Sequence, residues 1–239
     1  MSINFEELDY RQTRLGELIL RRRRDPLLAV EVFEVKLNDD FLMSSLFTVA
    51  EIELARLGLA ALDNASLDVV AGGLGLGYTA HAVLEDPRVR TLTIIEALPE
   101  VIEWHQRGLV PLGSQLSSDE RCHFIHGDFF KLASSTSQGF DPQFPGQRYH
   151  AILLDIDHSP RHVLHPDHAV FYKVDGIRNL KSHLHDEGVF AMWSNDQPEK
   201  DFMKILAEVF PKTESHVVKF QNPYQGCEAT ATIYVACAS

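Results

Sequence analysis

From about residue 67 to the end of the chain, short apolar runs alternate with stretches whose apolar residues recur at helical spacing. Short apolar runs bounded by turn residues predict buried strands, and the stretches between them predict helices packed on a sheet. This alternation predicts an α/β fold with a mostly parallel, doubly wound sheet. The expected strands cover Leu67–Ala71, Thr91–Ile95, His123–Ile125, Ala151–Leu154, Gly188–Trp193, Val217–Phe220 and Thr230–Ala236. The expected helices cover Thr79–Leu84, Pro99–Gly108, Phe171–Leu184 and Glu199–Val209.

The last two expected strands are joined by Asn222–Gly226, a loop that contains Pro and Gly and shows no helical pattern. Such a connection predicts an antiparallel hairpin at the edge of the sheet. A seven-stranded sheet that ends in this way resembles the methyltransferase-type, Rossmann-like sheet, whereas the dinucleotide-binding version has no terminal hairpin. A nicotinamide-dependent oxidoreductase is therefore disfavoured.

Residues 1–66 show a different pattern. Two short β-like runs, Glu17–Leu20 and Ala29–Leu37, precede a helical pattern over Leu46–Leu62. The sequence thus predicts a small N-terminal β and helical segment, followed by a catalytic domain over 67–239.

The first strand of that domain runs into a glycine-rich turn, GGLGLG, and a helical pattern follows at once. Its glycines Gly73, Gly75 and Gly77 lie at alternate positions. Glycine permits positive φ and lets the backbone approach a ligand closely, and the N-terminus of the next helix offers free N–H groups and a partial positive charge. The turn is typical of a nucleoside site, although strand-to-helix turns also use glycine for steric reasons alone.

Two acids follow the next strands in the order that a nucleoside site needs. Glu96 ends the second strand, about 20 residues beyond the glycines, where such folds place a carboxylate on the ribose hydroxyls. Asp128 follows the third strand, where methyltransferase-type sheets place an acid against the adenine amino group. The alternatives are a helix cap at Pro99 for Glu96 and an ordinary turn for Asp128. All three features in this order are more specific than any one of them.

The fourth strand ends in an acidic loop, LDIDHSP. Asp155 directly follows the apolar run, at the edge where open α/β sheets bind ligands. We expect Asp155 to be the general base and Asp157 to attract a cation. His158 is expected to touch the acceptor or to move a proton. The alternative for Asp155 is a structural cap on the loop backbone.

Histidines crowd the same loop, at His158, His162, His165 and His168. Histidine together with aspartate suits zinc or iron. The spacing matches no recognised ligand pattern, however, and Pro160 interrupts any helix that would present the rings together. We expect no metal.

The composition narrows the function classes. The net charge of the 239-residue chain is −12, which argues against a nucleic-acid surface. The one basic run, Arg21–Arg24, is expected to be a solvated strand end. No apolar run is long enough to cross a bilayer, and the start shows no signal-peptide pattern. These features predict a cytoplasmic protein with no membrane or nucleic-acid partner.

Taken together, these residues resemble the spermidine synthase-like (polyamine aminopropyltransferase) branch of the class I S-adenosylmethionine-dependent methyltransferase superfamily. The resemblance begins near Leu15 and is carried by GGLGLG, TIIEALPEVIEWHQ, HGDFF, YHAILLDIDHSP, the pair Phe171–Tyr172 and HLHDEGVFAMW. It implies S-adenosylmethionine or its decarboxylated form as the donor and a small-molecule amine as the acceptor. A homodimer is compatible with the sequence.

The chain departs from this family mainly in the acceptor half. The family's glycine loop, GGGDGG, carries an Asp where this chain has Gly75, and a Tyr-His pair stands where this chain has Leu42–Met43. The leading hypothesis is aminopropyl transfer to an amine, as in polyamine biosynthesis. The alternatives are a methyltransferase acting on a small molecule and a catalytically silent nucleoside-binding protein.

Overall fold

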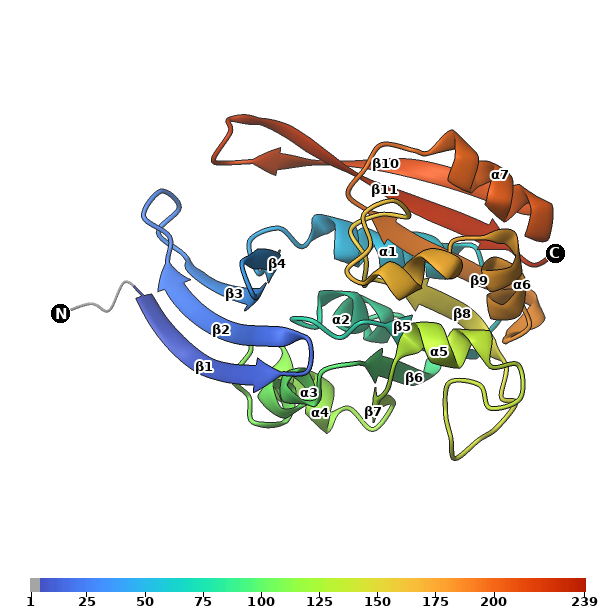
Figure 1. Cartoon of the computed structure of the whole chain (residues 1–239), viewed down its shortest axis with the longest axis horizontal. Helices are drawn as coiled ribbons and strands as arrows, with labels where there is room; N and C mark the ends of the chain where they lie inside the picture. Colours follow the sequence, from blue (N-terminus) through green and yellow to red (C-terminus); the bar gives the residue numbers. More distant parts are fainter. Residues whose placement is uncertain (1–4) are drawn as a thin grey trace.

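The computed structural model describes residues 5–239, which form two sheets connected along the chain by the first helix (Figure 1). The N-terminal sheet is an antiparallel meander in the order β1-β2-β3-β4. Its strands are β1 (Phe5–Thr13), β2 (Gly16–Arg24), β3 (Glu31–Leu37) and β4 (Asp40–Ser44). The helix α1 (Val49–Ala60) leads from this sheet to the larger one.

The N-terminal segment contains more strands than the sequence pattern predicts. β2 includes the run predicted over Glu17–Leu20, and β3 covers all but the first two residues of the run predicted over Ala29–Leu37, because Ala29 has a positive φ. The pattern predicts neither β1 nor β4. The residues of β1 are all exposed or half-buried, so few apolar positions signal a strand there. β1 is held by its antiparallel pairing with β2 instead. The predicted helix over Leu46–Leu62 is present, with both ends trimmed.

The larger sheet has seven strands in the order β10-β11-β9-β8-β5-β6-β7. The five strands from β9 to β7 are parallel, whereas β11 is antiparallel to both β9 and β10. The predicted methyltransferase-type sheet with a terminal hairpin is therefore confirmed. The strands are β5 (Leu67–Gly72), β6 (Val89–Glu96), β7 (Cys122–His126), β8 (Tyr149–Leu154), β9 (Leu184–Ser194), β10 (Lys212–Asn222) and β11 (Cys227–Cys237).

Helices cover both faces of this sheet, and successive residues of β5 show why. Val69 and Ala71 belong to one apolar cluster and Val70 to the other, because alternate side chains of a strand point to opposite faces. The first cluster contains residues of the N-terminal sheet and of α1 to α4, and the second contains residues of α5 to α7. The remaining helices are α2 (Tyr78–Leu84), α3 (Pro99–Gln106), α4 (Gly113–Ser118), α5 (Phe129–Ser134), the 3₁₀ helix η1 (Pro166–Val170), α6 (Val174–Lys181) and α7 (Lys200–Val209).

The helix predicted over Phe171–Leu184 is shorter than expected. α6 begins only at Val174, and Leu184 already belongs to β9. Phe171 and Tyr172 are buried in the second cluster, so they anchor the turn that precedes the helix. Because these two residues are apolar, they made the predicted helix longer than the helix in the structure.

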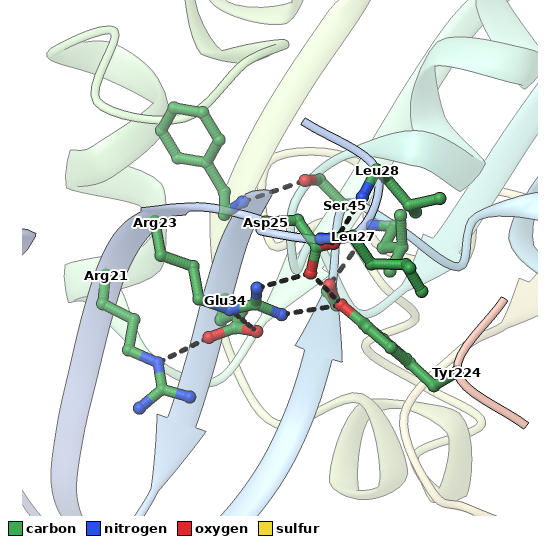
Figure 2. Close-up of polar contacts among 11 residues, drawn as sticks. Arg21, Arg23, Asp25, Leu27, Leu28, Glu34, Ser45 and Tyr224 are labelled. Carbon is green, nitrogen blue, oxygen red and sulfur yellow. Dashed lines mark hydrogen bonds and ion pairs between the residues drawn. The ribbon is translucent and has the colours of Figure 1, made fainter. Parts of the chain in front are cut away.

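A network of polar groups around the buried carboxylate of Asp25 ties the N-terminal sheet to the tip of the β10–β11 hairpin (Figure 2). The carboxylate of Asp25, just after β2, is fully buried. It accepts hydrogen bonds from the backbone N–H groups of Leu27 and Leu28, at 3.0 and 2.9 Å, and from Arg23 Nη1, at 2.7 Å. The hydroxyl of Tyr224 donates to the same carboxylate from the hairpin. We call Arg23, Asp25 and Tyr224 the clasp.

The basic run Arg21–Arg24 therefore differs from the expected solvated strand end. Arg21 and Arg23 both form ion pairs with the buried carboxylate of Glu34 on β3, at 2.6 and 2.8 Å (Figure 2). Cross-strand pairing within the sheet, and not a free basic surface, accounts for these two arginines. Among residues 5–239, no helix has the length and apolar character needed to span a membrane.

Candidate active site

A cavity of about 1310 Å³ lies where the carboxyl ends of the parallel strands meet the N-terminal sheet and the terminal hairpin. Most of the predicted site residues line it, although they come from four different strand ends. The lining includes Gly73, Gly75, Gly77, Glu96, Asp128, Asp155 and His158. Asp157 is the one predicted site residue outside this lining.

The glycine turn between β5 and α2 requires glycine for its backbone shape. Gly73, Gly75 and Gly77 have φ values of 94°, 49° and 92°, in the left-handed region that other residues rarely adopt. A Cβ on Gly73 would lie 2.2 Å from the carbonyl oxygen of Asp155, and one on Gly75 would lie 2.5 Å from Met43 Cε. The turn is thus packed between the acidic loop and β4, so glycine is needed there whether or not a ligand binds.

His105 on α3 contacts the backbone of the glycine turn. Its ring is fully buried, and its Nε2 lies 2.9 Å from the carbonyl oxygen of Gly75. Burial lowers the pKa of His105 to about 4, so the ring is neutral at pH 7 and donates one N–H to that carbonyl. No sequence pattern singled out this residue.

Glu96 ends β6 and lies buried beside the turn. Its Oε2 accepts a hydrogen bond from the N–H of Leu74, at 3.0 Å, and its Oε1 accepts one from the N–H of Leu98, at 2.9 Å. Burial raises the pKa of Glu96, and the backbone N–H groups offset part of that effect. Each carboxylate oxygen still has a lone pair for a ligand hydroxyl. The ribose contact predicted for Glu96 stays a prediction.

Asp128 is the N-cap of α5. Its Oδ1 accepts from the N–H groups of Phe130 and Lys131, at 3.1 and 3.2 Å. The ordinary capping role is therefore present, and it satisfies two of the free donors of the helix. The second oxygen lies 3.3 Å from Lys131 Nζ on the pocket side of the helix. The cap leaves that oxygen available, so the adenine contact stays a prediction.

Asp155 lies near a second acid that the sequence did not single out, Glu51, and both line the cavity. The hydroxyl of Thr79, in the first turn of α2, donates to Asp155 Oδ2 at 2.7 Å. The same hydroxyl lies 3.4 Å from the carbonyl oxygen of Glu51, in the first turn of α1. Burial raises the pKa of Asp155, and burial together with the charge of Asp155 raises the pKa of Glu51. The charge of Asp155 therefore makes it harder for the neighbouring Glu51 to lose its proton.

Asp157 has a different environment from the one predicted. Its side chain is almost completely buried, and it accepts hydrogen bonds from the N–H of Leu164 and from His168 Nδ1, at 2.7 and 2.9 Å. The hydroxyl of Tyr172 donates to its other oxygen at 2.8 Å. These three donors occupy the carboxylate and fold the acidic loop around it. This position does not support a cation-attracting role, and we assign Asp157 to holding the loop.

The loop histidines line the pocket separately. His158 lies near Trp193, with ring centroids 6.4 Å apart. His168 stacks on Phe130 with a centroid separation of 3.9 Å, and His162 Nδ1 lies 3.1 Å from a carboxylate oxygen of Asp196. Within the described residues, no group of three or more potential metal ligands comes together. All four histidines line the cavity, and the acceptor contact predicted for His158 stays a prediction.

Sequence reasoning missed Glu51, Thr79 and Met43, which all line or support the pocket. Glu51 lies in the first turn of α1, where an acid is common in any helix. Trp193 lines the pocket too, and its indole Nε1 is buried with no hydrogen-bond partner among residues 5–239. Only tertiary contacts reveal these positions, because each comes from a segment with no motif.

No family model matches the chain, and no curated protein is similar to it in sequence. Among solved structures it is similar to the spermidine synthase of Thermotoga maritima, with a TM-score of 0.72 over 98% of this chain and 72% of that one, at 15% identity. A spermidine synthase in complex with the transition-state analogue AdoDATO matches with the same values. Human methyltransferase-like protein 13 in complex with SAH gives a TM-score of 0.53 over 79% of this chain and 78% of that one, at 19% identity. The chain therefore shares the spermidine synthase-like, methyltransferase-type fold.

Proposed function

We propose that this chain is a spermidine synthase-like transferase, which binds an S-adenosylmethionine-type sulfonium donor and transfers an aminopropyl group to a small amine or polyamine. One observation carries the proposal: a single pocket contains the glycine turn, Glu96 and Asp128 together with the carboxyl pair Glu51–Asp155. The cavity of about 1310 Å³ is larger than the roughly 300–1,000 Å³ of a typical small-molecule pocket. It has room for a donor and an acceptor side by side.

The donor half fits a nucleoside. Glu96 offers carboxylate lone pairs beside the turn, and Asp128 offers an oxygen at the start of α5. The structures that share this fold hold AdoDATO in one case and SAH in another. Both facts support a ligand of the S-adenosylmethionine type.

The acceptor half supplies a base. Asp155 accepts a proton from the ammonium form of the acceptor and leaves a neutral amine. The amine lone pair then forms a C–N bond to the carbon next to the sulfonium, while the C–S bond breaks and its electron pair passes to sulfur. The products are a secondary ammonium and a neutral thioether. The donor carries the leaving-group chemistry, so the residues mainly position the reactants and move the proton.

Methyl transfer from ordinary S-adenosylmethionine is the second candidate. Arg14, Lys131 and Arg161 line the same cavity, and a methionine carboxylate needs donors of this kind. Calorimetry with S-adenosylmethionine, its decarboxylated form, 5′-methylthioadenosine and NAD tests the donor. We expect the adenosyl sulfur compounds to bind and NAD to show no binding.

Product analysis by mass spectrometry then tests the reaction. Each donor is incubated with a panel of diamines and polyamines, and a mass increase of one aminopropyl group on the acceptor supports the proposal. A methylated product supports the second candidate. Binding of donors without turnover of any acceptor would favour the silent nucleoside-binding protein instead.

A further inference from the structure

The side of the cavity next to the terminal hairpin differs in chemistry from the side that we assign to the donor. The donor features follow β5, β6 and β7, whereas β9, β11 and β10 lie beyond β8 in the opposite direction of the sheet order. From residue 184 to the end of the chain, every residue that lines the cavity is uncharged. We call these residues the hairpin wall: Trp193, Asn195, Phe220, Asn222, Ala229 and Ala231.

Trp193 begins the hairpin wall, next to the proposed base. Leu154 of β8 pairs with Met192 of β9 in the parallel register, so the two residues that follow, Asp155 and Trp193, are neighbours at the edge of the sheet. The indole Nε1 of Trp193 is buried and has no hydrogen-bond partner among residues 5–239, although the residue as a whole is only half-buried. The one polar atom of this side chain is therefore covered, and the ring meets the cavity with carbon atoms alone.

The hairpin wall continues across the next two strands of the sheet. Ala229 and Ala231 lie on β11, and Ala229 pairs with Phe220 of β10. Phe47, which precedes α1 and also lines the cavity, has its ring centroid 6.2 Å from that of Phe220. Because neighbouring strands are about 4.8 Å apart, the wall extends roughly 10–15 Å from Asp155. The short side chains of the two alanines leave room between the aromatic rings on β9 and β10.

We propose that Trp193 and the hairpin wall select an acceptor amine whose far end is apolar and uncharged, namely an arylalkylamine. This assignment rests on the proposed function and narrows its acceptor. With its amine at Asp155, such a molecule would lay its tail along Trp193 toward β11. Burial of the tail against carbon is favourable, and an aromatic tail also gains from edge-to-face or offset contacts with these rings. The second ammonium of a diamine would lose its hydration at this wall and meet no carboxylate there.

Two acceptors of nearly equal size test the charge at the far end. n-Hexylamine and 1,5-diaminopentane differ in one group, a terminal methyl in place of a terminal ammonium. Mass spectrometry measures the initial rate of aminopropyl transfer from the decarboxylated donor to each. We expect kcat/KM to be about 10- to 100-fold higher for n-hexylamine, and higher again for 3-phenylpropylamine. A diamine that reacts as well as n-hexylamine, or better, would overturn the assignment and leave the proposed function intact.

Variants of the wall should shift this ratio. Ala229→Asp adds an acid at a half-buried position of the lining, so it should lower the preference for n-hexylamine by about 10-fold or more. The matched control is Thr230→Asp, the next residue of β11, which lies outside the lining and should leave the ratio unchanged. Trp193→Ala should lower kcat/KM for 3-phenylpropylamine about 10-fold, whereas Trp193→Phe should retain most of it. Equal ratios in the two aspartate variants would contradict the assignment.

Fluorescence tests the wall without turnover. The chain has two tryptophans, and the other one, Trp104, is fully buried and donates a hydrogen bond to Asp9. With 5′-methylthioadenosine present, 3-phenylpropylamine should change the tryptophan emission of the wild type and leave that of Trp193→Phe unchanged. No change in the wild type, or a change that persists in Trp193→Phe, would overturn the assignment. Binding with the expected preference but without turnover of any amine would contradict the proposed function and leave the role of the wall standing.

Discussion

The clasp and the active-site pocket each contain a buried aspartate, and the two have opposite surroundings. Asp25 accepts four hydrogen bonds, and those from Tyr224 and Arg23 hold its pKa well below the ordinary range. Asp155 accepts one, from Thr79, and burial raises its pKa. The number of donors around a buried carboxylate therefore separates a group that holds the fold together from one left available to a substrate.

Other buried acids accept an intermediate number of hydrogen bonds. Asp157 accepts three hydrogen bonds and lies outside the pocket lining, whereas Glu96 accepts one on each oxygen and lines the pocket. Asp155 and Asp157 are only two residues apart, so sequence distance does not explain their difference. The loop folds around Asp157 and leaves Asp155 in the lining of the pocket.

The largest expected effect is on catalysis. Asp155→Asn keeps the hydrogen bond from Thr79 within reach but cannot accept a proton, so turnover should fall by roughly 10²–10⁴-fold. Donor binding should persist, and the remaining rate should recover partly at higher pH, where more of the acceptor amine is neutral. Steady-state kinetics against pH measure both.

The control for this variant is Asp157→Asn. It removes a carboxylate of the same loop that the structure occupies with three donors, so it should lower the melting temperature more than Asp155→Asn does. A normal rate for Asp155→Asn, with an acceptor in hand, would contradict its assignment as the base.

The next effect concerns Glu96, whose carboxylate accepts fewer hydrogen bonds than that of Asp25 and more than that of Asp155. Glu96→Gln keeps the size but loses the charge, so nucleoside binding should weaken by about 1–3 kcal/mol. Calorimetry should compare 5′-methylthioadenosine with its 2′-deoxy analogue in the wild type and in the variant. An equal loss on removing the 2′-hydroxyl in both proteins would show that Glu96 does not contact the ribose.

A smaller effect should appear in the pH dependence of stability. The raised pKa of Glu51, about 8, means that the folded protein binds more protons than the unfolded chain between the ordinary carboxyl range and pH 8. Stability should therefore fall as the pH rises through this window, by at most about 1.4 kcal/mol per pH unit for one proton. The lowered pKa values of His105, His150 and His183 act in the opposite direction, but only below about pH 6.5.

Urea unfolding of the wild type and of Glu51→Gln between pH 6.5 and 8 measures this slope. The variant should show a flatter profile, because it lacks the group that loses its proton. If stability changed equally with pH in the two proteins, the group with the raised pKa would not be Glu51.

The smallest expected effect is on the clasp. Tyr224→Phe removes one hydroxyl from a carboxylate that keeps three other donors, so the free energy of unfolding should fall by about 1 kcal/mol. Tyr10→Phe, on β1 and similarly exposed, is the matched control and should change stability less. A larger loss in the control would show that the hairpin tip contributes little to the fold.

The sequence predicted the larger sheet well, because its central strands β5 and β8 are buried on both faces and read as continuous apolar runs. The terminal hairpin followed from a Pro- and Gly-bearing loop between two such runs. β1 and β4 were missed because an edge strand of a small sheet needs few buried residues. The helix predicted before β9 was too long, because Phe171 and Tyr172 are buried without being helical.

The pocket was predictable where its residues follow strands, because chain order alone places strand ends at one edge. Gly75, Glu96, Asp128 and Asp155 were found in this way. Glu51 was not, because nothing in a helical pattern tells which acid turns toward a cavity. The different environments of Asp155 and Asp157 also depend on tertiary donors that no local pattern contains.

The clasp has a consequence for the order in which the chain folds. Asp25 and Tyr224 are 199 residues apart. Closing a flexible loop of that length costs about 4–5 kcal/mol of chain entropy, more than their single hydrogen bond returns. The contact therefore forms only after β5 to β9 have brought the two segments together. Because Phe220 and Asn222 of the same hairpin line the cavity, we expect ligand binding to appear in the last step of folding, after the parallel sheet is complete.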